Sequence, residues 1–116
     1  MGPGEIYWVA FLPRGGHARA GKRPAVVIQK QAACDELTVV LVVPLTSQQD
    51  AIRFSGTALI YPDAGNGLAR TSVALTFQTS AFDKTLLIER VGKLSDDDLR
   101  RVMSALKDVL VNLPNE

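Results

Sequence analysis

Residues 37–45 read LTVVLVVPL, and this stretch decides the fold class of the chain. It is apolar nearly throughout, which is typical of a β-strand covered on both faces. Shorter runs rich in β-branched and aromatic residues precede and follow it, with turn residues between them. The predicted strands are 5–11, 24–30, 37–45, 57–61, 72–78 and 86–91. A series of short strands of this kind indicates a small β-barrel or β-sandwich.

The C-terminal part changes from the spacing of strands to the spacing of a helix. Its apolar residues recur every three or four positions and form one face. These residues are Leu99, Val102, Met103, Leu106, Val109, Leu110 and Leu113. Ser95 is placed to cap the helix, the aspartates at 96–98 oppose the positive end of its dipole, and Pro114 is expected to end it. We expect the apolar face to pack against the sheet, and a partner helix is the alternative.

Length and composition are those of an ordinary globular protein. The 116 residues are 47% hydrophobic and 22% charged, with a net charge of +1, and they fit one domain over residues 1–116. The charge is unevenly distributed along the chain. Residues 1–30 hold five basic residues and one acidic residue, whereas residues 95–116 hold three basic and five acidic residues. This separation indicates an end of the molecule that faces anions.

A single cysteine, Cys34, and a single histidine, His17, limit the chemistry of the chain. No disulfide can form within it, which suits a reducing compartment, and a zinc site built from Cys and His is not expected. No apolar run reaches the roughly 18–20 residues of a membrane span, and no signal pattern stands at the N-terminus. We therefore expect a cytoplasmic protein without a membrane, a metal or a cofactor.

The stretch GGHARAGKRP (15–24) matches part of a phosphate-binding motif. Its glycines and Lys22 fit the G-x-x-x-x-G-K of a Walker A loop, but Arg23 stands where the motif requires Ser or Thr. A Walker A loop also opens a helix, whereas Pro24 and the apolar residues after it indicate a strand. A nucleotide site is not expected. Two interpretations remain, a solvated basic loop and a phosphate site of another kind.

Two short segments carry side chains that suit phosphate chemistry. Arg23, at the predicted start of a strand, can bind a phosphate through two parallel hydrogen bonds. His17 has an ordinary pKa near neutrality and can therefore move protons. After the central apolar strand, Thr46, Ser47 and Gln48 offer hydroxyl and amide groups to phosphates or base edges. A plain polar turn is the alternative interpretation of this second segment.

In their order along the chain, several motifs resemble those of the MazF/PemK family of toxin ribonucleases. The matching stretches are GEIYWV (4–9), GHxxxGKRP (16–24), VVPLTS (42–47), GL (67–68) before TSV (71–73), Gln78, and GKL (92–94). The resemblance covers almost the whole chain. It implies a mainly β fold, a small SH3-like (CcdB/MazF-like) barrel with a C-terminal α-helix, paired as a homodimer. It also implies an antitoxin with a disordered acidic tail, and DNA binding by toxin and antitoxin together.

The resemblance further implies an activity, the metal-independent and sequence-selective cleavage of single-stranded RNA. The ribose 2′-OH attacks the adjacent phosphate and leaves a 2′,3′-cyclic phosphate and a 5′-OH. This reaction needs a base, an acid, and positively charged groups or hydrogen-bond donors that stabilise the extra negative charge of the phosphorane. The matched catalytic residues are Arg23, Thr46 and His17. The residues expected to bind RNA are Arg14, Arg19, Lys22, Ser47, Gln48, Gln78 and Trp8, the last by stacking on a base.

Two departures from the family pattern leave a second function open. Ala18 and Phe77 stand where some members of the family carry polar or acidic side chains. Those groups help with proton transfer or RNA contacts elsewhere in the family. The alternative hypothesis is therefore a catalytically weak or non-catalytic barrel that binds RNA or a protein, as CcdB-like growth inhibitors do, because a fold does not fix a function.

Overall fold

The computed structural model describes residues 1–11 and 21–112, which form seven β-strands, two α-helices and three short 3-10 helices. The strands are β1 Glu5–Phe11, β2 Gly21–Val27, β3 Val39–Thr46, β4 Thr57–Ile60, β5 Ser72–Leu75, β6 Ser80–Asp83 and β7 Leu87–Lys93. The α-helices are α1 Gln31–Glu36 and α2 Asp96–Val109, and the 3-10 helices are η2 Gln49–Arg53, η3 Thr76–Gln78 and η4 Lys84–Leu86.

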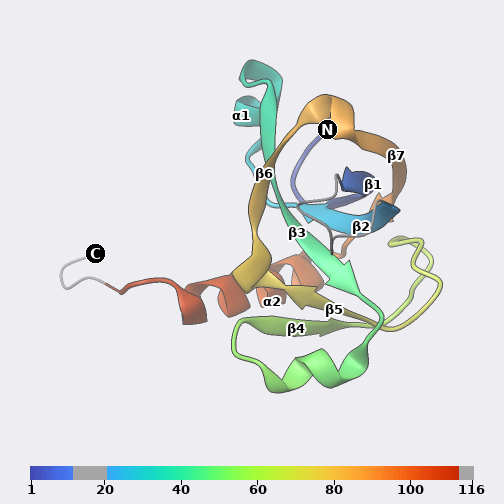
Figure 1. Cartoon of the computed structure of the whole chain (residues 1–116), viewed down its shortest axis with the longest axis vertical. Helices are drawn as coiled ribbons and strands as arrows, with labels where there is room; N and C mark the ends of the chain where they lie inside the picture. Colours follow the sequence, from blue (N-terminus) through green and yellow to red (C-terminus); the bar gives the residue numbers. More distant parts are fainter. Residues whose placement is uncertain (12–20, 113–116) are drawn as a thin grey trace.

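β3 lies at the centre of the sheet and pairs with other strands on both of its sides. On one side it pairs with β2, and on the other it pairs first with β6 and then, at its end, with β5. The strand order is β4-β5-β3-β2-β1-β7, and the pairs are antiparallel. The sheet curls strongly, as Figure 1 shows, but β4 and β7 remain its edges. The fold is thus barrel-like with open edges, which confirms the predicted mainly β class.

Two clusters of buried residues fill the two faces of the curled sheet. One lies between the sheet and α2 and contains Ile6, Val26, Val43, Leu45, Ala58, Ile60, Ala74, Leu94, Val102 and Ala105. The other lies on the opposite face and contains Val9, Ala25, Val27, Cys34, Val40, Val42 and Leu87. Successive residues of β2 and β3 alternate between the two clusters because side chains alternate across a strand. The central strands are therefore covered on both faces, as their apolar sequence predicts.

The coverage of β3 is nevertheless incomplete at its beginning. Val39 and Leu41 are 41% and 42% exposed, although the sequence predicts a strand buried on both faces from residue 37. They lie on the same side of the strand as Val43 and Leu45, which pack in the cluster beside α2. That cluster ends before it reaches the first half of β3, so this half has only one buried face.

The side chain of Gln29 continues the hydrogen bonding of β3 after β2 ends. The backbone N–H of Ile28 donates to the carbonyl of Leu41 over 3.1 Å. The buried Gln29 amide then donates from Nε2 to the carbonyl of Val39 over 3.0 Å and accepts at Oε1 from the N–H of Leu41 over 3.2 Å. The carboxamide replaces a strand residue here, because it offers the same donor and acceptor as a peptide group.

Several predicted boundaries differ from the observed ones. The strand predicted at 24–30 is β2, which begins at Gly21, so Lys22 and Arg23 lie within it. Pro24 is accommodated because the pairing of β2 with β3 begins only at Ala25, which leaves Pro24 beside β1 alone. The strand predicted at 72–78 ends at residue 75 and continues as η3. β6, α1 and η2 fall where the sequence predicts no element, because each is too short for a periodic pattern to show.

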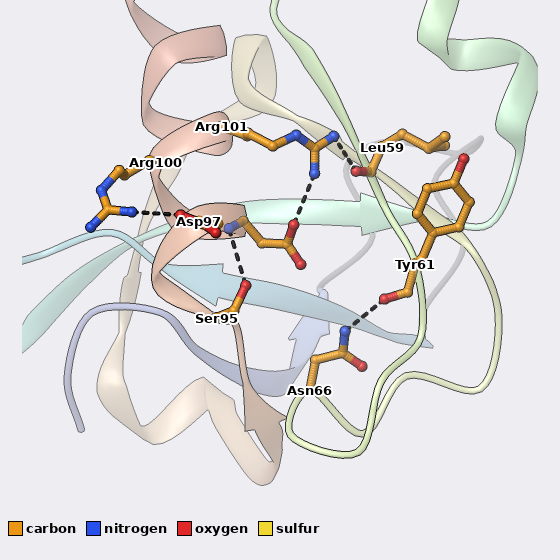
Figure 2. A network of polar contacts seen from close by, with 8 residues as sticks. Leu59, Tyr61, Asn66, Ser95, Asp97, Arg100 and Arg101 are labelled. Carbon is orange, nitrogen blue, oxygen red and sulfur yellow. Dashed lines mark hydrogen bonds and ion pairs between the residues drawn. The ribbon is translucent and has the colours of Figure 1, made fainter.

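α2 begins as predicted and ends earlier than predicted. The Oγ of Ser95 accepts a hydrogen bond from the N–H of Asp98 over 3.1 Å, and Arg101 donates to the carbonyl of Leu59 in β4 (Figure 2). The helix ends at Val109, with Leu110 in an extended conformation, so the prediction that Pro114 ends it is wrong. The chain runs away from the sheet beyond this point (Figure 1). The last apolar residues of the predicted face therefore do not pack on the sheet, and Leu113 lies outside the described residues.

Candidate active site at the ends of three strands

Three neighbouring strands bring predicted site residues together at one end of the sheet. Ala25 of β2 lies opposite Pro44 of β3, so Arg23, two residues before Ala25, and Thr46, two residues after Pro44, lie at the same end of the two strands. On the other side of β3, Thr46 lies opposite Val73 of β5. Arg23 and Thr46, which are distant in the sequence, therefore lie at the same end of the sheet, and β5 begins beside Thr46.

A cleft of about 480 Å³ opens at this end of the sheet. It is lined by Trp8, Arg23, Pro24, Leu45, Thr46, Ser47, Gln48, Gly67, Leu68, Ala69, Arg70, Ser72 and Val91. Five of the residues predicted for the site belong to this lining, namely Trp8, Arg23, Thr46, Ser47 and Gln48. The described lining contains two arginines and no carboxylate, so the cleft has the electrostatic character of an anion site.

The local structure around Arg23 and Thr46 fixes both residues in the cleft wall. Arg23 is exposed, and its backbone lies in β2 opposite Val9 of β1. The proline that follows it also favours the extended conformation. The Oγ1 of Thr46 accepts a hydrogen bond from the backbone N–H of Gln48 over 3.2 Å. This bond orients the hydroxyl and leaves its own hydrogen available for donation to a ligand.

Trp8 and Lys22 form a pair at the side of the cleft. Trp8 lies opposite Pro24 in the register of β1 and β2, and Lys22 is two residues before Pro24 on the same face. The Nζ of Lys22 lies 5.3 Å from the centroid of the Trp8 ring. Such a contact is worth about 0.5–1 kcal/mol at an exposed position. Lys22 thus brings positive charge to the edge of the cleft without lining it.

The structure does not bring all the predicted residues to the cleft. Gln78 is exposed at the end of η3, outside the cleft lining. His17, Arg14 and Arg19 lie outside the described residues. The position of the predicted proton carrier relative to Arg23 and Thr46 therefore stays a prediction.

Sequence reasoning did not identify Arg70, which lines the cleft from the loop between β4 and β5. Asn66, which is 0% exposed, organises this loop. Its Oδ1 accepts from the N–H groups of Asp63 and Leu68 over 3.1 and 3.0 Å. Its Nδ2 donates to the carbonyl of Tyr61 over 2.9 Å (Figure 2). A signal was present in the sequence, because the GL motif at 67–68 stands two residues before Arg70.

Two glycines let the backbone of this loop lie directly on β7. A Cβ on Gly67, whose φ is +68°, would lie 2.2 Å from the carbonyl oxygen of Val91. A Cβ on Gly92 would lie 2.4 Å from the carbonyl oxygen of Asn66. The N–H of Lys93 also donates to the carbonyl of Gly65 over 2.9 Å. The backbone of the loop that carries Arg70 is therefore held in place by its contacts with β7.

The titratable groups with shifted pKa values lie outside the cleft lining. Burial, and then the 2.7 Å hydrogen bond to Glu5, raise the pKa of Tyr7 to about 12. Burial raises the pKa of Glu5, but the hydrogen bonds from Tyr7 and from the Gly2 backbone outweigh it, so that the pKa lies below the ordinary value. Two hydrogen bonds from Thr85 lower the pKa of Asp83. These groups stabilise local structure and do not face the arginines of the cleft.

Residues 1–11 and 21–112 contain neither a metal-binding cluster nor a membrane-spanning helix. Among these residues, no group of three or more His, Cys, Asp or Glu side chains is arranged to hold a metal ion. No helix in the same part of the chain is long and apolar enough to span a membrane.

The fold and the cleft define a class, small curled-sheet proteins with a C-terminal helix and a cationic cleft at one end of the sheet. The chain matches the model of the family described as PemK-like, MazF-like toxin of type II toxin-antitoxin system over residues 2–110. It is 30% identical over 107 residues to endoribonuclease MazF6 of Mycobacterium tuberculosis, covering 91% of this chain and 93% of the relative. The chain therefore belongs to the PemK/MazF family of toxins, which confirms the resemblance found in the sequence.

Solved structures of the family share the fold. The crystal structure of MazF (Form-I) from Deinococcus radiodurans matches with a TM-score of 0.72 and 24% identity over 91% of this chain and 92% of that one. A structure described as an endoribonuclease in complex with its cognate antitoxin from Mycobacterial species matches with a TM-score of 0.72 and 16% identity, over 91% and 90% of the two chains.

Proposed function

We propose that residues 1–116 form one toxin domain that cleaves single-stranded RNA at selected sequences. The observation that carries this proposal is the presence of Arg23 and Thr46 in one cleft whose described lining is cationic. A cleft with two arginines and no carboxylate suits a polyanion. The name of the MazF6 relative, an endoribonuclease, supports the same activity.

In the proposed mechanism, the ribose 2′-oxygen attacks the adjacent phosphorus and the bond from phosphorus to the 5′-oxygen breaks. Arg23 donates two N–H groups to the non-bridging oxygens, on which negative charge increases in the phosphorane. The Thr46 hydroxyl, oriented by the Gln48 N–H, donates to one of the same oxygens. The products are a 2′,3′-cyclic phosphate and a 5′-OH.

One of the two proton transfers in this mechanism is assigned to His17. The described cleft lining holds no His, Cys, Asp or Glu, and His17 is the one histidine of the chain. The proton of the 2′-OH goes to the base, and the acid supplies a proton to the departing 5′-oxygen. His17 is the candidate for one of these two transfers. The arginine side chains supply the positive charge, so the proposed reaction proceeds in the presence of EDTA.

RNA contacts around the reacting phosphate are proposed for the rest of the cleft. Trp8 offers a ring for base stacking, worth about 1–3 kcal/mol per base. Ser47 and Gln48 offer hydrogen bonds to base edges, and Lys22 adds charge beside Trp8. Arg14 and Arg19 are proposed to extend the contact from the segment outside the described residues. In this proposal Gln78 contacts the part of the RNA that extends from the cleft to η3.

The homodimer is proposed to form through an exposed apolar surface away from the cleft. This surface, the Phe54 patch, consists of Ile52, Phe54, Phe77, Val109, Leu110 and Val111, which are 39–82% exposed. The rings of Phe54 and Phe77 meet edge to face at 6.2 Å, and Val109 lies against Gly56, two residues after Phe54. A second copy of the chain suits this patch, because an acidic partner would favour the arginines of the cleft instead.

The antitoxin is proposed to occupy the cationic cleft with its acidic tail, so that it excludes RNA. The structural neighbour solved with its cognate antitoxin supports such a partner. Toxin and antitoxin together are proposed to bind DNA, and the toxin to act on mRNA in the cytoplasm.

The test of the proposed function is cleavage by the purified chain without antitoxin. A mixture of single-stranded RNAs of diverse sequence is incubated with the protein in EDTA, and the fragment ends are mapped and analysed. Fragments with 2′,3′-cyclic phosphate and 5′-OH ends at a short common sequence are expected. Intact RNA after long incubation would refute the nuclease. Tight RNA binding without cleavage would favour the second candidate, a non-catalytic binder, which the exposed Phe77 and the absence of carboxylates in the described cleft lining support.

A further inference from the structure

We infer that Arg70 is a second phosphate-binding residue of the cleft and that it holds a phosphate adjacent to the one cleaved. This inference rests on the proposed function for the identity of the ligand, single-stranded RNA. It rests on the structure for the position of Arg70, which lines the same cleft as Arg23.

The topology places the two arginines on opposite walls of the cleft. Arg23 lies on β2, Thr46 lies at the end of β3, and Arg70 stands two residues before β5. β3 separates β2 from β5 at this end of the sheet. Neighbouring strands are 4.7–4.9 Å apart, so the backbones of β2 and β5 are separated by about 10 Å. This spacing is wider than one phosphate group, which Arg23 and Thr46 already bracket in the proposed mechanism.

Besides its arginines and its hydroxyl and amide groups, the cleft has a mostly apolar lining. Pro24, Leu45, Leu68 and Val91 contribute to the cleft lining together with Trp8. An apolar surface suits a base or a sugar and does not suit a third phosphate. The cleft therefore has the pattern expected for one nucleotide with a phosphate on each side, one held by Arg23 and the other by Arg70.

The loop around Arg70 is organised before any ligand binds. Asn66 is fully buried and makes three hydrogen bonds within the loop, and the N–H groups of Gly65 and Asn66 donate to Oδ1 of Asp63 over 2.9 and 2.7 Å. Contact of the loop with β7 at Gly92 fixes its backbone from outside. A cation on a fixed loop loses less conformational freedom on binding than one on a mobile loop. This organisation distinguishes Arg70 from a surface arginine that only solvates the protein.

The first experiment measures binding, so that it is independent of catalysis. The probe is a pool of random-sequence 20-nucleotide RNAs with 2′-fluoro sugars, which carry phosphates but lack the attacking hydroxyl. Arg70→Ala is expected to weaken binding about tenfold and to reduce the slope of log affinity against log salt by about 0.7, as for one lost phosphate contact. Arg70→Lys is expected to retain the slope. The matched control is Arg100→Ala on α2, whose side chain pairs with Asp97, and it is expected to leave both values unchanged.

The second experiment locates the phosphate on a cleavable RNA that contains the mapped cleavage sequence. Arg70→Ala is expected to raise KM about tenfold while kcat falls by less than threefold. A neutral methylphosphonate is then placed at one of the two phosphates that flank the cleaved one. At the phosphate that Arg70 holds, it is expected to raise the KM of the parent protein about as much as Arg70→Ala does. With this RNA, Arg70→Ala is expected to cause no further rise in KM. A fall in kcat with an unchanged KM, or an undiminished Arg70→Ala effect with both flanking methylphosphonates, would overturn the inference. If Arg70→Ala leaves the salt slope of the first experiment unchanged, the inference is overturned even when the protein cleaves RNA. If Arg70→Ala lowers the slope but the parent protein cleaves no RNA, only the proposed nuclease activity is refuted.

Discussion

The cleft and the Phe54 patch lie on one small sheet and are built in opposite ways. The cleft gathers polar and cationic side chains on backbone that is fixed by strand pairing and by the buried Asn66. The patch gathers apolar side chains on η2, η3 and the end of α2, where the chain leaves the sheet. A rigid polar surface suits chemistry on a charged ligand, and an exposed apolar surface suits association. The two proposed roles, RNA cleavage in the cleft and formation of the homodimer at the patch, therefore belong to separate regions. Each role can be removed by its own substitution.

The largest expected effect is confined to the cleft. Arg23→Ala should lower kcat/KM for RNA cleavage by about 10²-fold or more, because it removes the donor that stabilises the phosphorane. The free energy of unfolding should change by less than about 0.5 kcal/mol, because Arg23 is exposed. Steady-state cleavage and urea unfolding measure the two quantities, with Arg100→Ala as the control. Equal rates for Arg23→Ala and the parent protein would exclude the assigned role.

The next effect is confined to the patch. Phe77→Asp should raise the dissociation constant of the homodimer by about 30-fold or more, as expected when a charge replaces an aromatic anchor worth at least 2 kcal/mol. Ile88→Asp is the matched control, because Ile88 is also exposed but lies on β7, outside the patch. Light scattering over a dilution series measures the dimer. If Ile88→Asp dissociates the dimer and Phe77→Asp does not, the interface lies elsewhere.

A third variant tests the fixed backbone of the cleft. Gly92→Ala should lower the free energy of unfolding by about 1–3 kcal/mol, because the new Cβ meets the backbone of Asn66 and neither side can yield easily. The displaced loop should also raise KM for RNA. Gly65→Ala is the control in the same loop, since its Cβ would make only ordinary contacts at 3.5 and 3.7 Å. Equal stability of the two variants would contradict the close contact between the loop and β7.

The smallest effect involves neither region. The pKa of Tyr7 is raised to about 12, so the stability that this shift provides is fully present below pH 10 and is lost as the pH rises toward 12. The free energy of unfolding should therefore fall over this interval in the parent protein, and this fall should be smaller in Tyr7→Phe. Urea unfolding at pH 9, 10 and 11 measures the difference. Identical pH dependence in the two proteins would show that burial and the hydrogen bond to Glu5 do not raise the pKa of Tyr7.

Sequence patterns predicted the elements whose signal is local. The apolar run of β3, the aromatic-rich β1 and the Ser95 cap each have a recognisable pattern within a few residues. The division of residues 72–83 into β5, η3 and β6, where one strand is predicted at 72–78, has no local signal. It depends on how two parts of one segment pair with different parts of β3, which only the folded sheet determines.

The candidate site divides in the same way. Arg23 and Thr46 were predicted because each lies in a motif that resembles a known family. Arg70 was not predicted, because its place in the cleft depends on the contact of its loop with Gly92, far along the chain. The early end of α2 was also missed, since an apolar periodicity that continues past Val109 does not show where packing partners end.

The Gln29 carboxamide has a consequence for how this fold tolerates change. By bonding to Val39 and Leu41, it fixes the register of β3 without help from the segment between them. The length of the connection through residues 30–38 can therefore vary on either side of the buried Cys34 while β3 keeps its alignment with β2. An insertion there leaves Thr46 and Arg23 in the same cleft, so the chain can acquire new surface elsewhere without disturbing the chemistry of the cleft.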